Sequence, residues 1–344
     1  MPARPVVIQC FPMMHPVGEE ILGRQVELRT ASSPDPATVI REGDGARAII
    51  GRSPARIGAE VLDALRDLLV VPATGSGADW VDIQACRDRG IPVLHNPGVA
   101  PTPVTEYVLG AMVMVYKRLR EADAFLRAGG DWEPKDRFRG REVTGKVLGV
   151  VGLGAIGGDV ARRARAAFDM TVLAHDPGVP DSRFEEVGAE RVERIEALFE
   201  QADVISLHLP LLPETRGLVD AAVLAHCRPD AVLVNASRGG VVDEAALVEA
   251  LRSGRLSGAA TDVFDPEPPR ADNALFQMPN VVVTPHIAGL TVDATIKLST
   301  AVAANVLAAL RGERPPHIVN PEAWPPRRLD AASPVWPLTA TVSA

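Results

Sequence analysis

Arg238, Asp262, Glu267 and His286 are the residues whose types could carry out chemistry together. Each lies at or just after the end of a short apolar run that we expect to be a strand. His286 can exchange a proton near neutral pH, and a nearby carboxylate such as Glu267 would raise its pKa. The guanidinium of Arg238 can hold a carboxylate through two parallel hydrogen bonds. These residue types fit reduction of a 2-keto acid, where a proton donor must meet the developing alkoxide.

Each of these residues alone is also compatible with an ordinary structural role. A histidine after a strand is more often structural or solvated than catalytic. Arg238 stands beside two glycines, where it could cap a helix or join a surface ion pair. Glu267 lies among prolines and could be a loop charge. Their joint occurrence beyond a glycine-rich turn favours the chemical interpretation.

The glycine-rich turn follows an apolar run and precedes a helical pattern. In this arrangement Gly152 makes the turn, Gly154 lets the backbone approach a pyrophosphate, and Gly157 lets helix and strand pack closely. The helix start, at Ala155 and Ile156, directs free N–H groups and a partial positive charge at the anion. The pattern predicts a dinucleotide site, and the alternative is an ordinary strand–helix turn.

Asp176 indicates which dinucleotide binds. It lies 19 residues after Gly157, at the end of the next predicted strand. A carboxylate there holds the adenine ribose hydroxyls and repels a 2′-phosphate, and Pro177 stands where an arginine would favour NADP. The sequence therefore predicts NAD, although Arg183 leaves some NADP use open. Asp262 could accept a hydrogen bond from the carboxamide of the cofactor.

Two segments alternate predicted strands and helices, which favours an α/β fold with parallel sheets. Residues 5–98 form the first, and residues 99–288 the second, where six strands fit a doubly wound sheet. In the first, the turns Gly51–Pro54 and Ala73–Gly77 follow strands, at the end of the sheet where such folds bind ligands. The strands expected in it are Val6–Gln9, Val26–Leu28, Ala48–Ile50, Leu68–Val71 and Val93–Leu94.

Three further segments complete the organisation. A long helix is expected from Pro101 to about Ala128 between the two α/β segments, with proline early and two glycines late. A final helix is expected over Val292–Arg311. Residues 325–344 are rich in proline and predict an extended tail, which Trp324 and Trp336 could anchor.

Composition excludes several classes of partner. The 344 residues are 47% hydrophobic and carry a net charge of -8, so we expect neither nucleic-acid nor membrane binding. No apolar run approaches a membrane span, and the N-terminus predicts a first strand rather than a signal peptide. Cys10, Cys86 and Cys227 have neither disulfide nor zinc spacing, so we expect buried thiols, a cytoplasmic location and no metal.

Several motifs in order resemble the D-isomer-specific 2-hydroxyacid dehydrogenase family. The similarity runs from about residue 48 to residue 321 and includes Asn96-Pro97-Gly98 and Thr105-Glu106. The motifs that carry it are Gly152–Gly157, Asn235-Ala236-Ser237-Arg238-Gly239, Thr261-Asp262-Val263-Phe264 with Glu267-Pro268, Thr284-Pro285-His286-Ile287-Ala288-Gly289 and Asn320-Pro321-Glu322.

The resemblance implies two βαβ domains: a Rossmann NAD-binding domain at 99–291 and a flavodoxin-like substrate domain at 1–98 plus 292–324, with the active site in the cleft between them. It implies a catalytic set of Arg238, Glu267 and His286, and a homodimer joined through the 101–128 region. The substrate candidates are Arg52, Ser53, Gly75, Ser76, Gly77, Arg238 and His286. The cofactor candidates are Gly152, Gly154, Ala155, Ile156, Gly157, Asp176, His208, Pro210, Ala236, Ser237, Arg238, Asp262, His286, Gly289 and Thr105.

The substrate and one other function class stay open. Ala73 stands where phosphoglycerate-type members carry an arginine, whereas Arg52-Ser53 resembles the pair those members use for an anionic group. Glyoxylate, hydroxypyruvate and 3-phosphoglycerate-type substrates are therefore all expected candidates.

The chain departs from the family pattern at other positions. Trp80 stands where members of the family often have asparagine, and Leu212 stands where they often have threonine. Glu267 departs from formate-type members, which pair the histidine with glutamine. Corepressors of the C-terminal-binding type share the fold and the catalytic set, and form the alternative.

Overall fold

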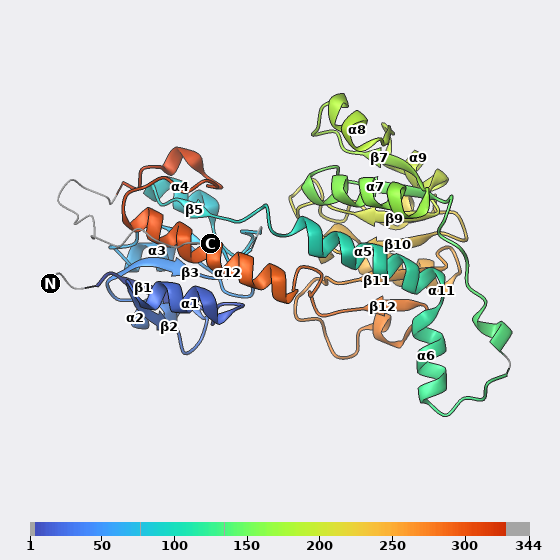
Figure 1. Ribbon diagram of the computed structural model, residues 1–344, viewed down its shortest axis with the longest axis horizontal. Coiled ribbons are helices and arrows are strands. Elements are labelled where there is room, and N and C mark those ends of the chain that lie inside the picture. The colour runs from blue at the N-terminus through green and yellow to red at the C-terminus, as the bar shows by residue number, and fades with distance from the viewer. Residues whose placement is uncertain (1–3, 76, 134, 328–344) are drawn as a thin grey trace. The chain divides into compact units, whose positions relative to one another are not determined.

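The computed structural model describes residues 4–75, 77–133 and 135–327 and divides into two compact units (Figure 1). Unit 1 comprises Met1–Ala100 and Thr291–Ala344, and unit 2 comprises Pro101–Leu290. Ser76 and residues 328–344, which hold Trp336 and most of the expected tail, lie outside the described residues.

Unit 1 is built on a sheet of short parallel strands. Strand pairing gives the order β2-β1-β3 and the pair β4-β5, and the parallel bridges Ala48↔Val70 and Gly51↔Ala73 connect the two. The combined order 2-1-3-4-5 is the flavodoxin-like one and confirms the expected fold class for this part of the chain. The strands are β1 (Val6–Gln9), β2 (Glu27–Thr30), β3 (Ala46–Ile50), β4 (Val71–Pro72) and β5 (Val93–Leu94).

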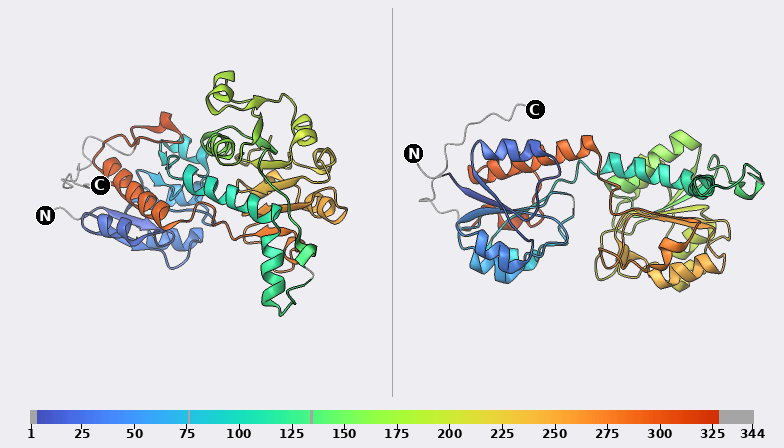
Figure 2. Two further views of the ribbon diagram at one scale, coloured as in Figure 1. Left: turned by 45° about the vertical axis from the view of Figure 1, so that its right-hand side comes forward. Right: turned by 90° about the horizontal axis from the view of Figure 1, so that it is seen from below.

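Helices cover both faces of this sheet (Figure 2). Because side chains alternate along a strand, Val7 packs in the core that includes α12 while Ile8 packs in the core that includes α3. Asp35 and Asp82 cap α2 and α4 by accepting hydrogen bonds from Thr38 N and Ala85 N. The helices are α1 (Pro16–Gly23), α2 (Pro36–Glu42), α3 (Ala59–Ala64), α4 (Ile83–Arg89) and α12 (Val292–Leu310), followed by the 3₁₀ turn η4 (Pro321–Ala323).

α12 is the one described helix whose length and composition would let it cross a membrane. Its apolar character has another explanation, because Val302, Ala303 and Val306 are fully buried in the core of unit 1 beside Leu22 of α1. The helix therefore supplies a layer of the core of unit 1, against the sheet.

Unit 2 contains a seven-stranded parallel sheet in the order β12-β11-β10-β9-β6-β7-β8. Numbered within the unit, this is the doubly wound order 3-2-1-4-5-6 with one more strand at the edge, so the Rossmann class is confirmed. The strands are β6 (Val147–Val151), β7 (Thr171–His175), β8 (Glu190–Arg191), β9 (Val204–Leu207), β10 (Val232–Asn235), β11 (Gly258–Thr261) and β12 (Val281–Val283).

The register of this sheet brings the ends of six strands to one level. The Cα partners in this row are His175, Val151, Leu207, Asn235, Thr261 and Val283. The next residue of each strand therefore leaves the sheet at the same carboxyl edge, and these residues are Asp176, Gly152, His208, Ala236, Asp262 and Thr284. The register thus explains why predicted site residues far apart in sequence are gathered in unit 2.

Helices lie on both faces of the seven-stranded sheet, with α5 and α7 side by side on one of them (Figures 1 and 2). The helices and 3₁₀ turns are α5 (Pro101–Tyr116), α6 (Leu119–Arg127), η1 (Lys135–Phe138), α7 (Ala155–Phe168), α8 (Asp181–Val187), α9 (Ile195–Gln201), α10 (Ala221–Leu224), η2 (Gly239–Val241), α11 (Glu244–Arg252) and η3 (Ala274–Gln277).

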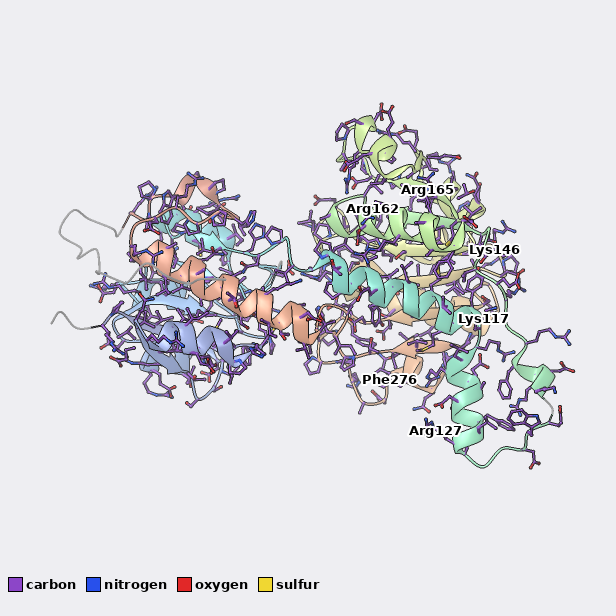
Figure 3. The ribbon with its side chains drawn as sticks, viewed as in Figure 1. Lys117, Arg127, Lys146, Arg162, Arg165 and Phe276 are labelled. Atoms are coloured by element: carbon purple, nitrogen blue, oxygen red, sulfur yellow. The ribbon has the colours of Figure 1, made fainter. Side chains whose placement is uncertain are left out.

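The expected single helix from Pro101 to about Ala128 is wrong, because the chain breaks between α5 and α6. Arg118 adopts a left-handed conformation with φ 54°, which ends the i to i−4 ladder. Its side chain bonds Glu121 Oε1 at 2.9 Å and the Arg137 carbonyl at 2.6 Å. Figure 3 labels Lys117 at the break and Arg127 near the end of α6, which leaves in a new direction. Apolar periodicity continues across the break, so the residue pattern does not predict it.

Asn320 connects the segment after α12 to the chain around β5 in unit 1. It is fully buried, accepts a hydrogen bond from Val93 N at 2.8 Å and donates one to the Ile91 carbonyl at 3.0 Å. Asn320→Ala leaves both buried backbone groups unpaired, so we expect about 2–4 kcal/mol of lost stability. Urea unfolding followed by circular dichroism measures this. The control is Asn280→Ala, which removes one exposed bond to the Ser257 carbonyl and should change stability far less.

Candidate active site

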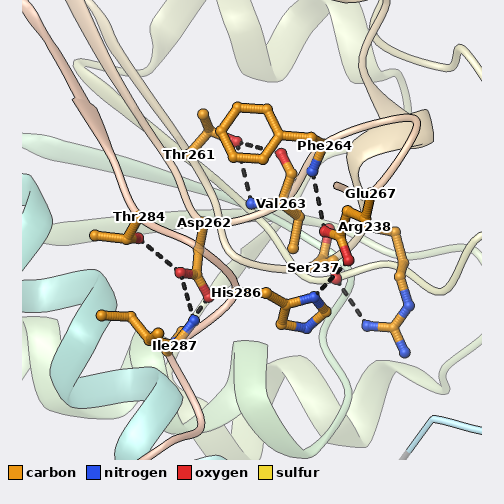
Figure 4. A network of polar contacts seen from close by, with 11 residues as sticks. Ser237, Arg238, Thr261, Asp262, Val263, Phe264, Glu267, Thr284, His286 and Ile287 are labelled. Carbon is orange, nitrogen blue, oxygen red and sulfur yellow. Dashed lines mark hydrogen bonds and ion pairs between the residues drawn. The ribbon is translucent and has the colours of Figure 1, made fainter. Parts of the chain in front are cut away.

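His286 and Glu267 form a hydrogen-bonded pair in the loops that follow β12 and β11. His286 Nδ1 lies 2.8 Å from Glu267 Oε2, and Phe264 N donates to the other carboxylate oxygen at 3.1 Å (Figure 4). The hydrogen bond to Glu267 raises the pKa of His286 above its ordinary value, and the charge of Arg238 opposes this shift. Burial pushes the pKa of Glu267 upward, but the hydrogen bond and charge of His286, the Phe264 N–H and the charge of Arg238 together outweigh burial, and the net shift is downward. The pair favours an imidazolium beside a carboxylate.

Asp262 holds the loop that carries His286. Its side chain is fully buried and accepts hydrogen bonds from Ile287 N at 2.8 Å and Ala288 N at 2.7 Å, while its carbonyl accepts one from His286 N at 2.8 Å. His286 has φ 56°, a conformation that costs a non-glycine residue about 1–3 kcal/mol. The bonds on either side of His286 fix this backbone, so Asp262 has a positioning role that the sequence did not reveal. Its predicted contact with the cofactor carboxamide stays a prediction.

Thr284 and Tyr107 are further members of this network that sequence reasoning missed. The Thr284 hydroxyl donates to Asp262 Oδ1 at 2.6 Å and lies 2.6 Å from the Tyr107 hydroxyl of α5. Burial raises the pKa of Tyr107 to about 12, so its hydroxyl stays protonated. Thr284 directly follows β12, and the rule that polar residues at strand ends form sites could have found it. Nothing in the sequence pointed to Tyr107.

Arg238 is placed by a turn after β10. Asn235 Oδ1 accepts hydrogen bonds from Ser237 N at 3.1 Å and Ser237 Oγ at 2.8 Å, and Asn235 Nδ2 donates to the Arg238 carbonyl at 3.0 Å. At Gly239 a Cβ would lie 2.1 Å from the Phe264 carbonyl carbon, so only glycine lets the two loops approach. Arg238 is near enough to lower the pKa of Glu267 by its charge. The structure therefore brings Arg238, Glu267 and His286 together (Figure 4).

The glycine motif forms the turn between β6 and α7. Gly152 has φ 93°, and a Cβ there would lie 2.6 Å from the His208 carbonyl oxygen. A Cβ on Gly157 would lie 2.0 Å from the Gly152 carbonyl oxygen, so a side chain would push the helix off the strand. A Cβ on Gly154 would meet nothing within 4 Å. The first and third glycines therefore close the turn, and the second leaves its outer side open for a ligand.

The start of α7 fits an anionic ligand. Among the described residues no side chain caps this helix, and its backbone ladder begins with Gly158 N donating a hydrogen bond to the Gly154 carbonyl. The N–H groups of Ala155 and Ile156 thus lack helical partners beside the open side of Gly154. In α5 the fully buried Thr105 hydroxyl has no hydrogen-bond partner among the described residues. Such an orphaned polar atom is what a ligand or an ordered water satisfies, and the residues present therefore fit a bound dinucleotide.

Asp176 sits against the same turn. Its carboxylate accepts hydrogen bonds from Leu153 N at 2.7 Å and Gly178 N at 2.8 Å. Arg183 donates to the carbonyls of Leu153 and Gly154 at 3.0 Å each, and to Glu186 at 2.7 Å. Arg183 is the residue for which the sequence left some NADP use open. Its guanidinium is already hydrogen-bonded to the glycine turn and to Glu186.

Other predicted cofactor residues lie in the loops of the same edge. His208 accepts or donates a hydrogen bond with Ser206 at 2.8 Å, and burial lowers the pKa of His208 to about 4, so it is neutral. Ser237 is buried in the Asn235 turn, while Pro210 and Gly289 are exposed. Their contacts to a cofactor stay predictions.

The predicted substrate residues of unit 1 lie in two loops that backbone hydrogen bonds connect to each other and to Asn96. Thr74 N donates to the Gly51 carbonyl at 3.0 Å, and Asn96 N donates to the Gly75 carbonyl at 3.1 Å. Arg52 is partly buried and donates to the Pro12 carbonyl at 3.2 Å. Ser53 is exposed, Gly77 is partly exposed, and Ser76 falls outside the described residues.

Comparison with known proteins shows the family. Residues 109–288 match the family model described as "D-isomer specific 2-hydroxyacid dehydrogenase, NAD binding domain". The chain belongs to the D-isomer-specific 2-hydroxyacid dehydrogenase family. This confirms the predicted family, and the seven-stranded unit with the glycine turn and Asp176 is its NAD-binding domain.

Two curated relatives of this dehydrogenase family differ in coverage. D-3-phosphoglycerate dehydrogenase of Mycobacterium leprae is 42% identical over 299 residues, which are 87% of this chain and 56% of the relative. (S)-sulfolactate dehydrogenase of Chromohalobacter salexigens is 41% identical over 278 residues, 80% of this chain and 88% of the relative. The chain thus spans little more than half of the phosphoglycerate dehydrogenase.

A solved member of the family has the same fold. The NADPH-dependent glyoxylate/hydroxypyruvate reductase of Sinorhizobium meliloti, in complex with NADP and malonate, gives a TM-score of 0.84 at 29% identity, covering 93% of this chain and 98% of that chain. Members named for different substrates and cofactors therefore resemble this dehydrogenase-family chain, and its own substrate has to be argued from its residues.

Replacing Glu267 by glutamine tests the electrostatic pairing. Glu267→Gln keeps the size of the side chain but removes the charge that raises the pKa of His286, so that pKa should fall toward its ordinary value near 6.5. A proton–carbon NMR titration of the imidazole resonances measures it. The matched control is Glu200→Gln, because Glu200 binds His226 in the same way at 2.8 Å. An unchanged titration of His286 in Glu267→Gln would contradict the pairing.

Asp176→Ser tests the choice of cofactor. Loss of the carboxylate removes a ribose hydrogen bond and the repulsion of a 2′-phosphate, so NADH should bind about tenfold more weakly while the NADPH-to-NADH affinity ratio rises. Fluorescence titration with each nucleotide gives both constants. Asp181→Ser, which removes an exposed carboxylate paired with Arg191, is the control and should leave the ratio unchanged. A constant ratio in Asp176→Ser would argue against the assignment.

Proposed function

We propose that the chain is an NAD-dependent D-2-hydroxyacid dehydrogenase that works mainly as a 2-keto acid reductase. The observation that carries this proposal is the His286–Glu267 pair beside Arg238, in the same unit as the glycine turn and Asp176. The family supports it, because its members are named dehydrogenases acting on hydroxy acids.

The proposed chemistry divides among three side chains. NADH, when bound, supplies the hydride to the carbonyl carbon of the 2-keto acid. His286, held by Glu267 through Nδ1, gives the proton on Nε2 to the developing alkoxide. Glu267 keeps the imidazole charged and oriented, and Arg238 binds the substrate carboxylate and carbonyl through its guanidinium. Reduction therefore needs the imidazolium, and its rate should fall as pH rises through the pKa of His286.

The substrates we propose are small 2-keto or 2-hydroxy acids of the glyoxylate, hydroxypyruvate or 3-phosphoglycerate type, and the sulfolactate relative adds a 3-sulfonated acid. Arg52 supports a substrate with a second anionic group. It is partly buried, burial lowers its pKa, and no carboxylate pairs with it among the described residues. A desolvated guanidinium without an acidic partner is a ready anion site. We propose that Arg52, Ser53 and the Gly75–Gly77 loop contact this part of the substrate.

We also propose a cytoplasmic homodimer. Cys10, Cys86 and Cys227 are buried free thiols, as expected in a reducing compartment. In the predicted 101–128 region α6 buries none of its residues in this chain, and Leu119 and Leu126 are about half exposed at 51% and 50%. Apolar side chains of this kind on one helix favour burial against a second copy.

A panel of 2-keto acids tests the activity. NADH oxidation should be detected with at least one of glyoxylate, hydroxypyruvate, 3-phosphohydroxypyruvate and 3-sulfopyruvate. Turnover with none of them, with NADH still bound, would overturn the proposal and favour the scaffold alternative.

His286→Ala tests the proton donor. We expect kcat to fall by about 10²–10⁴-fold, because general acid catalysis is lost, with NADH affinity nearly unchanged. Steady-state kinetics and NADH fluorescence separate the two effects. His226→Ala is the matched control, since His226 has a similar glutamate partner, and it should keep the parent rate. A His286→Ala variant with the parent kcat would rule out this role.

A further inference from the structure

Trp80 and Gly51 of unit 1 interlock. The Trp80 side chain is buried, and a Cβ built on Gly51 would lie 2.6 Å from Cζ3 and 2.8 Å from Cη2 of its ring. These distances are shorter than any real Cβ contact, so position 51 has room for glycine alone while the tryptophan is present. The Trp80 carbonyl also accepts a hydrogen bond from Ile57 N at 3.0 Å, which ties the two loops together.

This contact lies directly before Arg52 in the chain. The Gly51 backbone is held by the Trp80 ring and by the hydrogen bond from Thr74 N to its carbonyl. The Arg52 guanidinium lies 4.7 Å from the centroid of the Phe11 ring and donates to the Pro12 carbonyl. Arg52 is thus held next to its backbone by the packing of Gly51, and at its guanidinium by the Phe11 ring and the Pro12 carbonyl.

Two buried polar atoms in the same loops lack partners. Trp80 Nε1 and the Thr74 hydroxyl are buried and make no hydrogen bond within the part of the chain that the structure describes. A buried unpaired polar group costs about 1–3 kcal/mol. A phenylalanine at position 80 would carry no buried N–H group and would avoid that cost. Stability alone therefore does not explain the tryptophan.

We propose that Trp80 is a positioning residue that sets Arg52 for a tetrahedral anionic group on C3 of the substrate. This rests on the proposed 2-keto acid reductase function and deepens it. Arg52 is the one cationic residue in the sequence segments 51–53 and 73–79, so it is the group in these loops that can bind a sulfonate or phosphate. A guanidinium binds such groups in a fixed bidentate geometry, and a shift of about 1 Å can cost 100-fold.

The test compares substrates that have or lack the C3 anion. Trp80→Asn empties the space under Gly51, so the KM for 3-sulfopyruvate, 3-phosphohydroxypyruvate or both should rise about tenfold or more. The kinetic constants for glyoxylate, which has no C3, should stay within about twofold. Either anion responding supports the proposal and identifies the group recognised. Equal loss for glyoxylate, or no loss for either anion, would overturn it.

Three further variants separate positioning from folding. Gly51→Val should raise the same KM by pushing the loop from the other side, and adding Trp80→Asn should restore it in part. Trp80→Phe keeps an aromatic ring but lacks the outer indole atoms that contact Gly51, so it should raise the same KM less than Trp80→Asn does, whereas a loss as large as in Trp80→Asn would refute positioning by the ring. Val61→Ala makes a cavity in the same core and is the control: it should lower stability in urea without changing the substrate ratio.

Failure of the proposed function itself gives a different result. The parent chain would then turn over neither glyoxylate nor the C3-anionic acids. The inference remains testable by calorimetric binding of 3-sulfolactate and glycolate to the full chain with NADH. Weaker binding of 3-sulfolactate alone in Trp80→Asn supports it, and equal binding by both chains refutes it.

Discussion

The buried carboxylate of Asp262 is the constraint on which the candidate active site depends. A carboxylate without solvent must have its hydrogen bonds supplied by the protein, and here Thr284 and two backbone N–H groups supply them. Those donors belong to the segment that carries His286. If His286 left its left-handed backbone conformation, the buried carboxylate would lose hydrogen bonds that solvent does not replace. The pairing with Glu267 then orients a ring whose backbone is already fixed. Asp262 therefore fixes the position of His286 without a bound ligand.

The parallel register explains why so much of this arrangement could be predicted. A strand that is buried on both faces appears in the sequence as a short apolar run, and its end appears as the first polar residue. Because parallel strands end at one edge, Asp176, His208 and Asp262 had to meet near Gly152, whatever their separation in sequence. The spacing of the glycines added the turn, since each excludes a side chain for a separate steric reason.

The rest depended on contacts that have no periodic signature. The break at Arg118 comes from one residue in a left-handed conformation, with apolar spacing intact on both sides. The bond of Tyr107 to Thr284 joins a helix to a strand end 177 residues away, and neither residue type indicates the other. The full burial of Asp262 was equally hidden, because an aspartate after a strand is as compatible with a solvated loop. Local pattern predicts where a side chain leaves the sheet, and tertiary packing decides what it then bonds.

The two units differ in what their loops can determine. Recognition of the C1 carboxylate, transfer of a proton and binding of a dinucleotide are needed for the reduction of every 2-keto acid, and the residues that we propose for them lie in unit 2. What distinguishes one 2-keto acid from another lies beyond C2, and the group that we propose binds it from segments 51–53 and 73–79 of unit 1 is one guanidinium, that of Arg52. A single charge discriminates only if its position is fixed, because a flexible arginine can follow many anions. In the proposed site, the packing beneath Arg52 therefore contributes to substrate choice together with the charge, and it follows from the size of Trp80 and the missing side chain of Gly51.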